Sequence, residues 1–203
     1  MRAGPSGDDV TGAGPADLLD ARLPTYDVAL TEHLTVEADV PAVFRAAHDL
    51  DFLTVRTPLL ATAFFVRGLP ARLSGKPSPE LPALRLFADP SSSGLPGWLV
   101  LGEVPDREIA FGAVGKFWQA DIEWHDVPLD RFTAFDEPGW GKIGCHFLIR
   151  ANGPGRSVVS YECRTGTTDP ESRKKMMRYW WIIRPFVGHI MRATLRTIAA
   201  DAR

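Results

Sequence analysis

The sequence predicts an α+β fold in which an antiparallel sheet packs against a long C-terminal helix. Residues 97–165 consist of short apolar runs separated by Gly, Pro and Asp, a pattern typical of an antiparallel meander. Helical patterns lie on both sides of this region, and the last of them runs from about Pro170 to Ala200. With 203 residues, of which 45% are hydrophobic, the chain is large enough for one domain with its own core.

The first part of the chain is predicted to contain a leader, a strand and two short helices. Residues 1–22 are rich in Gly, Pro, Ala and Asp without periodicity, which predicts a disordered leader before a single domain over 23–203. Loose alternation of apolar residues predicts a strand within 26–38. Asp39 and Thr57 each precede a helical pattern with a proline in its first turn, so each is predicted to cap a short helix.

A long loop and a hairpin are predicted next. Prolines and the stretch SSSG prevent a continuous strand or helix over 74–97, which leaves room for one short strand at 83–87. Two apolar runs around a Pro-Asp turn then predict a hairpin in which Val104 faces Arg107. That register places four apolar side chains on one face, namely Trp98, Val100, Ile109 and Phe111.

The last hairpin has a register that alternation can specify, because a slip of one residue would move every side chain to the other face. Pairing Ala151 with Ser157 keeps the apolar set together on one face. That set is Ile143, Cys145, Phe147, Ile149, Val159, Tyr161 and Cys163. The opposite face carries His146, Arg150, Glu162 and Arg164, and we expect it to meet water.

The C-terminal helix is predicted to begin with a capping box of Thr168 and Glu171, with Pro170 in its first turn. Pro185 lacks an N–H group and should kink this helix. Arg184 interrupts the apolar run, which is therefore too short to span a membrane. The predicted apolar stripe consists of Met176, Trp180, Ile183, Val187, Ile190 and Thr194, widened by Tyr179, Ile182 and Phe186.

Two segments resemble a known superfamily. The stretch HLTVEADVPAVFRAAHDL is similar to the first strand and helix of the START-like or SRPBCC helix-grip superfamily, and YWWIIRPFVGHIMRATLRTIAADA resembles its gripping helix. The resemblance covers about Tyr26 to Ala200, and residues 74–97 depart from it as a long insertion. It implies a curved sheet wrapped around the last helix, with a mostly apolar cavity between them. Members of this superfamily include carriers of lipids, sterols and hormones, aromatic polyketide cyclases, and many proteins without known activity.

Three hypotheses about function follow. The leading one is binding of a small hydrophobic or aromatic molecule, lipid-like or polyketide-like, between the sheet and the C-terminal helix. The second is a cyclase or aromatase type of enzyme, with Tyr161 or His48 as the acid or base. The third is an interaction protein whose large aromatic residues only fill a closed core. The predicted ligand-binding residues are Trp98, Phe111, Phe147, Tyr161, Cys163, Trp180, Ile183 and Val187.

Other classes of site have little support. The 23 basic and 25 acidic residues nearly cancel, so a nucleic-acid partner is not predicted. No glycine-rich nucleotide motif occurs, and the five histidines lack zinc-ligand spacing, so neither a cofactor nor a metal is predicted. The two cysteines are too few for a secreted disulfide framework, and no signal peptide is visible, which favours the cytoplasm. A homodimer is left open.

Two local groupings have alternative interpretations. Cys145 and Cys163 are predicted to lie opposite each other, either as two buried thiols, which we favour, or as a disulfide. Asp121, Glu123 and His125 alternate along one predicted strand. They could form a base oriented by its neighbour, but a solvated strand face is the simpler interpretation.

Overall fold

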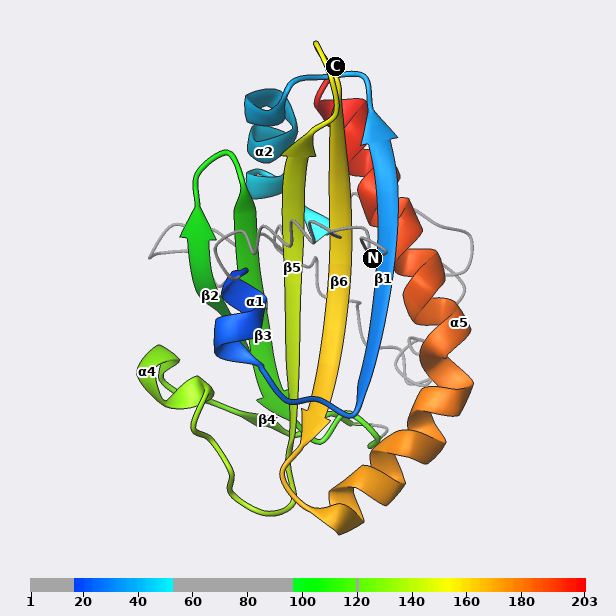
Figure 1. Cartoon of the computed structure of the whole chain (residues 1–203). Helices are drawn as coiled ribbons and strands as arrows, with labels where there is room; N and C mark the ends of the chain where they lie inside the picture. Colours follow the sequence, from blue (N-terminus) through cyan, green and yellow to red (C-terminus); the bar gives the residue numbers. More distant parts are fainter. Residues whose placement is uncertain (1–16, 53–96, 120) are drawn as a thin grey trace, which may run out of the picture.

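The computed structural model describes residues 17–52, 97–119 and 121–203. Figure 1 shows an antiparallel sheet with a long helix, α5, running beside β1. The strand order is β1-β6-β5-β3-β2, and β4 pairs with β3. The described elements are α1 (Leu18–Arg22), β1 (Val28–Val36), α2 (Val40–His48), β2 (Trp98–Val104), β3 (Glu108–Gly115), β4 (Trp124–His125), α4 (Leu129–Phe132), β5 (Gly141–Ala151), β6 (Ser157–Thr167) and α5 (Pro170–Asp201).

The predicted fold class is confirmed, because a curved antiparallel sheet packs against a long C-terminal helix in a helix-grip arrangement. The strand within 26–38 and the helix capped by Asp39 are also confirmed, and the Asp39 side chain accepts a hydrogen bond from the N–H of Ala42. The predicted helix from Thr57 and the predicted strand at 83–87 lie outside the described residues. So does all of the predicted loop except Gly97.

Helices cover both faces of the sheet, and each face takes its name from one of its helices. The α5 face is covered by α2 and α5, and it holds the larger apolar core, which includes Phe111, Phe147 and Ile198. The α1 face is covered by α1 and α4. Its smaller apolar cluster contains Leu101, Ala110, Val114 and Phe132, with Leu18 packed against it.

The β5–β6 hairpin has the predicted register, since Ala151 pairs with Ser157 and Cys145 pairs with Cys163. The apolar set lies in the α5-face core as predicted. The expectation that the other face meets water holds for Arg150, which is exposed, but is wrong for two of the other residues. His146 and Arg164 on that face are buried rather than in water, because α1 lies across it (Figure 1).

The β2–β3 hairpin corrects the predicted turn. Val104 pairs with Glu108 rather than with Arg107, whose N–H instead donates to the carbonyl of Val104 within the turn. A bulge between Val100 and Gly102 then shifts the register by one residue. Val100 therefore lies opposite Phe111, as the predicted register requires, because the bulge compensates for the longer turn.

Helix α1 contradicts the predicted leader over its last residues. Residues 18–22 form a helix, and the side chains of Leu19 and Leu23 are fully buried against the sheet. Gly144 on β5 makes this approach feasible, because a Cβ atom there would lie 2.7 Å from the Leu19 side chain. The structured domain therefore begins before residue 23.

Helix α5 begins at Pro170 as predicted, but its N-cap lies one residue after the predicted one. Asp169, not Thr168, is the N-cap, and its carboxylate accepts hydrogen bonds from the N–H groups of Glu171 and Ser172. Thr168 instead exchanges hydrogen bonds with the backbone of Trp140, in the segment before β5. An aspartate at the N-cap also places a negative charge at the positive end of the helix dipole.

The apolar stripe of α5 is narrower than predicted. Met176, Trp180, Met191 and Ile198 are buried, whereas Ile182 and Phe186 are exposed on the outer side of the helix. Trp181 beside them is 83% exposed. Pro185 lies inside α5 as expected, and Figure 1 shows that the helix curves along its length.

Candidate ligand-binding site

Three of the predicted ligand-binding residues form an aromatic cluster at the centre of the α5 face. The ring centroids of Phe147 and Tyr161 are 4.6 Å apart, and those of Phe111 and Phe147 are 5.5 Å apart. Phe111 is 1% exposed and Phe147 is fully buried. These rings therefore pack on one another, and Trp98 packs on Phe111 at 5.6 Å.

Tyr161 lies together with Cys145 and Cys163 on this face. Both cysteines are free thiols. Burial, followed by the hydrogen bond and charge of Cys163, raises the pKa of the Cys145 thiol well above its ordinary value. Burial, followed by the charge of Cys145, likewise raises the pKa of Tyr161. At neutral pH the Tyr161 hydroxyl and the Cys145 thiol are therefore both uncharged.

The other candidates for acid–base chemistry are placed elsewhere. His48, the last residue of α2, lies with its Nδ1 atom 2.9 Å from the Asp49 carboxylate. In the predicted grouping of Asp121, Glu123 and His125, Glu123 forms a 2.8 Å ion pair with Lys116, and the ring of His125 packs against Trp140. Glu123 and His125 thus have separate partners. The predicted strand is reduced to Trp124 and His125, so Asp121 and Glu123 do not share a strand face with His125.

An open groove of about 400 Å³ lies where α5 crosses β1, the edge strand of the sheet. Its apolar wall is formed by Leu30, Trp180, Trp181 and Pro185, and its charged groups are Glu32, Arg184 and Arg192, with Gly188 completing the lining. A Cβ atom at Gly188 would lie 3.3 Å from the Glu32 carboxylate and 3.4 Å from the Leu30 side chain. The glycine thus lets α5 approach β1 closely.

The groove contains one of the eight predicted ligand-binding residues, Trp180, in the described part of the chain. Val187 and Cys163 are half-buried beside the α5-face core, and Ile183 is half-buried on α5. Trp98 lines a second hollow of about 340 Å³ next to Val127. The predicted ligand-binding residues therefore do not form one site. They are divided between the aromatic core, the groove beside β1 and the hollow that Trp98 lines.

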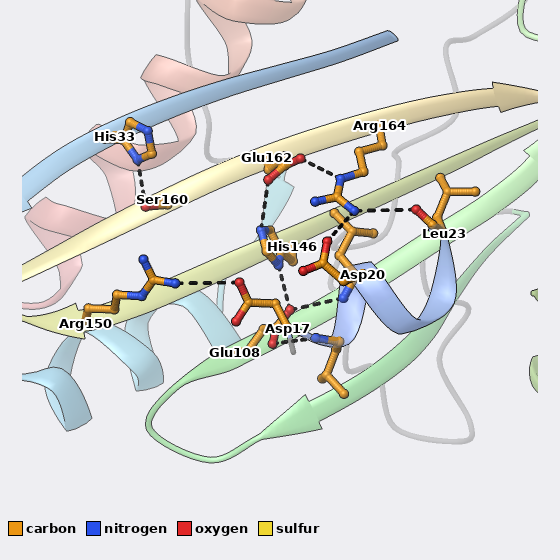
Figure 2. A network of polar contacts seen from close by, with 12 residues as sticks. Asp17, Asp20, Leu23, His33, Glu108, His146, Arg150, Ser160, Glu162 and Arg164 are labelled. Carbon is orange, nitrogen blue, oxygen red and sulfur yellow. Dashed lines mark hydrogen bonds and ion pairs between the residues drawn. The ribbon is translucent and has the colours of Figure 1, made fainter. Parts of the chain in front are cut away.

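The α1 face holds a chain of charged groups that sequence reasoning missed as a site (Figure 2). The Nδ1 atom of His146 lies 2.6 Å from the Glu108 carboxylate, and its Nε2 atom lies 3.6 Å from Glu162. Glu162 is 2.6 Å from Arg164, which in turn is 2.7 Å from Asp20 on α1. The side chains of His146 and Glu108 are only 3% and 1% exposed.

The charges in this network are stabilised by one another. Burial lowers the pKa of His146, but hydrogen bonds and charges from Glu108 and Glu162 outweigh this effect and raise it overall. Burial raises the pKa of Glu108, but His146 and the backbone N–H groups of Leu18 and Leu19 lower it overall. The hydrogen bond from His146, with a further contribution from Arg164, lowers the pKa of Glu162 to about 2.

The hydrogen-bonding groups of this network are satisfied by other groups of the protein. Glu108 accepts hydrogen bonds from Leu18, Leu19 and His146, so its carboxylate faces donors on every side. We interpret the network as the attachment of α1 to the sheet. The sequence does carry a signal for it, since alternation places His146, Glu162 and Arg164 on one face. Glu108 joins that face only through the pairing of β3 with β5, for which the sequence offers no local signal.

The described residues contain neither a metal site nor a membrane span. Among them, no three His, Cys, Asp or Glu side chains come together in a way that could hold a metal ion. None of the described helices is long and apolar enough to cross a membrane.

Comparison with known proteins gives no family assignment. No protein-family model matches the chain, and no curated protein matches it. Among solved structures it is similar to CalU16 from Micromonospora echinospora, with 14% identity, a TM-score of 0.29, and coverage of 86% of this chain and 85% of that chain. It is also similar to TTHA0849 from Thermus thermophilus, with 10% identity, a TM-score of 0.30, and coverage of 86% of this chain and 97% of that chain. Similarities this low identify neither a family nor a function.

Proposed function

We propose that this protein binds a small hydrophobic or aromatic molecule between α5 and the sheet, in the groove where α5 crosses β1. The observation that carries the proposal is an open groove of about 400 Å³ with two indole rings, a leucine and a proline in its wall. Its volume and apolar lining are typical of sites for small ligands. The charged groups at its margin are of the kind that fix a ligand's orientation.

The aromatic cluster of the α5 face supports this location indirectly. Because Phe111, Phe147 and Tyr161 already pack on one another, a ligand there would have to displace a close-packed core. The groove needs no such rearrangement. Tyr161 is therefore assigned to the core, and the groove takes the role that was expected for a central cavity.

Trp181 offers a direct test, because its exposed indole forms part of the groove wall. We expect Trp181→Ala to weaken binding of the neutral dye phenylnaphthylamine by roughly threefold to tenfold, as expected for the loss of one aromatic contact. Dye fluorescence during titration of the full chain measures the affinity. Thermal unfolding should be nearly unchanged, because the side chain is 83% exposed.

Ile182→Ala is the matched control, since Ile182 is the next residue, is 70% exposed and does not line the groove. It should leave dye affinity unchanged. If the unmodified protein does not bind the dye, or if the two variants lose affinity equally, the groove is not the binding site and the proposal fails.

A further inference from the structure

The charged groups of the groove are not balanced. Arg192 donates a hydrogen bond to Glu32 across the gap between α5 and β1, so these two charges compensate each other. Arg184 is exposed and has no ion-pair or hydrogen-bond partner among the residues that the structure describes. Of the described lining, Glu32 is the one acidic residue. The lining that the structure describes therefore has a net charge of +1, which comes from Arg184.

Arg184 also lies beside the apolar wall. Trp180, Arg184 and Gly188 follow one another at intervals of four residues, which places them on one side of α5. Trp180 is buried one turn before Arg184, and Gly188, one turn after it, leaves the space against Leu30 without a side chain. Arg184 thus lies one turn from a buried indole ring and one turn from Gly188, where Leu30, Glu32 and Arg192 approach the helix.

We propose that the groove binds an amphipathic monoanion, such as an apolar carboxylic acid, whose anionic group pairs with Arg184. This inference rests on the proposed function and names the chemical class of its ligand. A guanidinium binds a carboxylate through two parallel N–H···O hydrogen bonds, and the apolar body then lies on Trp180 and Leu30. A doubly charged group fits less well, because Arg184 is the one uncompensated positive charge of the described lining.

Two dyes that differ by one sulfonate test the inference on the full chain. Phenylnaphthylamine is neutral, and anilinonaphthalene sulfonate is the same ring system with one negative charge. We expect Arg184→Gln to weaken binding of the sulfonate about tenfold, because a charge-assisted hydrogen bond is lost. Affinity for the neutral dye should change by less than about twofold. Arg178→Gln, on α5 outside the groove lining, should leave both affinities unchanged.

The outcomes separate this inference from the proposed function. If the unmodified protein binds neither dye, both proposals are overturned. If it binds the neutral dye but not the sulfonate, only the inference is overturned. The same holds if Arg184→Gln leaves the sulfonate affinity unchanged, or if it weakens both dyes equally.

A competition experiment tests the carboxylate directly. Decanoate and decanol have the same chain and differ in the anionic group, so each can be titrated against bound phenylnaphthylamine. We expect decanoate to displace the dye at lower concentration than decanol, and we expect Arg184→Gln to abolish that difference. Arg184→Lys should restore part of it, because lysine keeps the charge but not the two-point hydrogen bonding. Equal displacement by the two compounds in the unmodified protein would overturn the inference.

Discussion

The two faces of the sheet are built from the same strands but with opposite chemistry. On β5 and β6, Phe147 and Tyr161 point to the α5 face, whereas His146 and Glu162 point to the α1 face. On these strands both faces contain buried side chains. Apolar burial covers the α5 face, and compensated charges attach α1 to the other.

This difference determines which face of the sheet responds to pH. The α5-face cluster contains no group that carries a charge at neutral pH, since Tyr161 and Cys145 both have raised pKa values. The α1 face depends on the protonation of His146 and on the ionisation of Glu108 and Glu162. The stability lost by a mutation on the α1 face should therefore depend on pH, and the stability lost by a mutation on the α5 face should not.

The largest effect is expected on the α5 face. Phe147→Ala removes a fully buried ring from the aromatic cluster and should lower the free energy of unfolding by about 4 kcal/mol. Urea denaturation near pH 6 and at alkaline pH measures this loss. The loss should be equal at both pH values, because no group of the aromatic cluster changes its charge between them. A loss that depended on pH would contradict the distinction between the faces.

A smaller but pH-dependent effect is expected on the α1 face. Glu108→Gln removes a buried carboxylate that accepts three hydrogen bonds, and near pH 6 it should lower the free energy of unfolding by about 3 kcal/mol. The same urea series should show a smaller loss at alkaline pH. There His146 is uncharged even in the unmodified protein, so less electrostatic attraction remains to be removed.

The sign of this pH dependence follows from the pKa shifts. The pKa of His146 is raised above 6.5, so its contribution to stability is complete below that pH and is lost as the pH rises through the raised pKa. The pKa values of Glu108 and Glu162 are lowered from 4.5, so their contributions are complete above that pH and are lost on acidification, for Glu162 through about 2. The network is therefore most stabilising between pH 4.5 and 6.5. A loss for Glu108→Gln that grew with alkalinity would contradict the assigned charges.

The smallest effect is expected at the margin of the network. Arg150 lies 3.6 Å from Asp17 and is 67% exposed, so Arg150→Ala should change the free energy of unfolding by less than about 0.5 kcal/mol. Urea denaturation would detect a larger change, which would show that the attachment of α1 extends to exposed charges. Asp17 retains its 3.0 Å ion pair with Arg107 in this variant.

Much of the fold is predictable because strand alternation is a local signal. The β5–β6 register agrees with the sequence, since a slip of one residue would place Glu162 among the apolar set. The predicted β2–β3 turn is too short, because the bulge before Gly102 has no clear mark in a single sequence. Helix α1 escapes prediction because Leu19 and Leu23, at helical spacing, follow a segment rich in Gly and Pro.

The candidate site is predictable in type but not in place. The sequence identifies α5 as the helix that meets the sheet, and it predicts Trp180, which lines the groove, as a ligand-binding residue. It does not show that α5 runs beside the edge strand β1, because strand order depends on pairing between distant segments. In the sequence, Arg184 is only an interruption of an apolar run. Its position in the groove depends on the packing of α5 against β1.

The attachment of α1 has a practical consequence for shortened versions of this protein. A chain cut at residue 23 would lose the two backbone N–H groups that solvate the buried Glu108 carboxylate, together with the Leu19 side chain. Any truncation is therefore best made before Asp17, so that this residue keeps its ion pair with Arg107. An affinity tag is better separated from this helix by a flexible spacer.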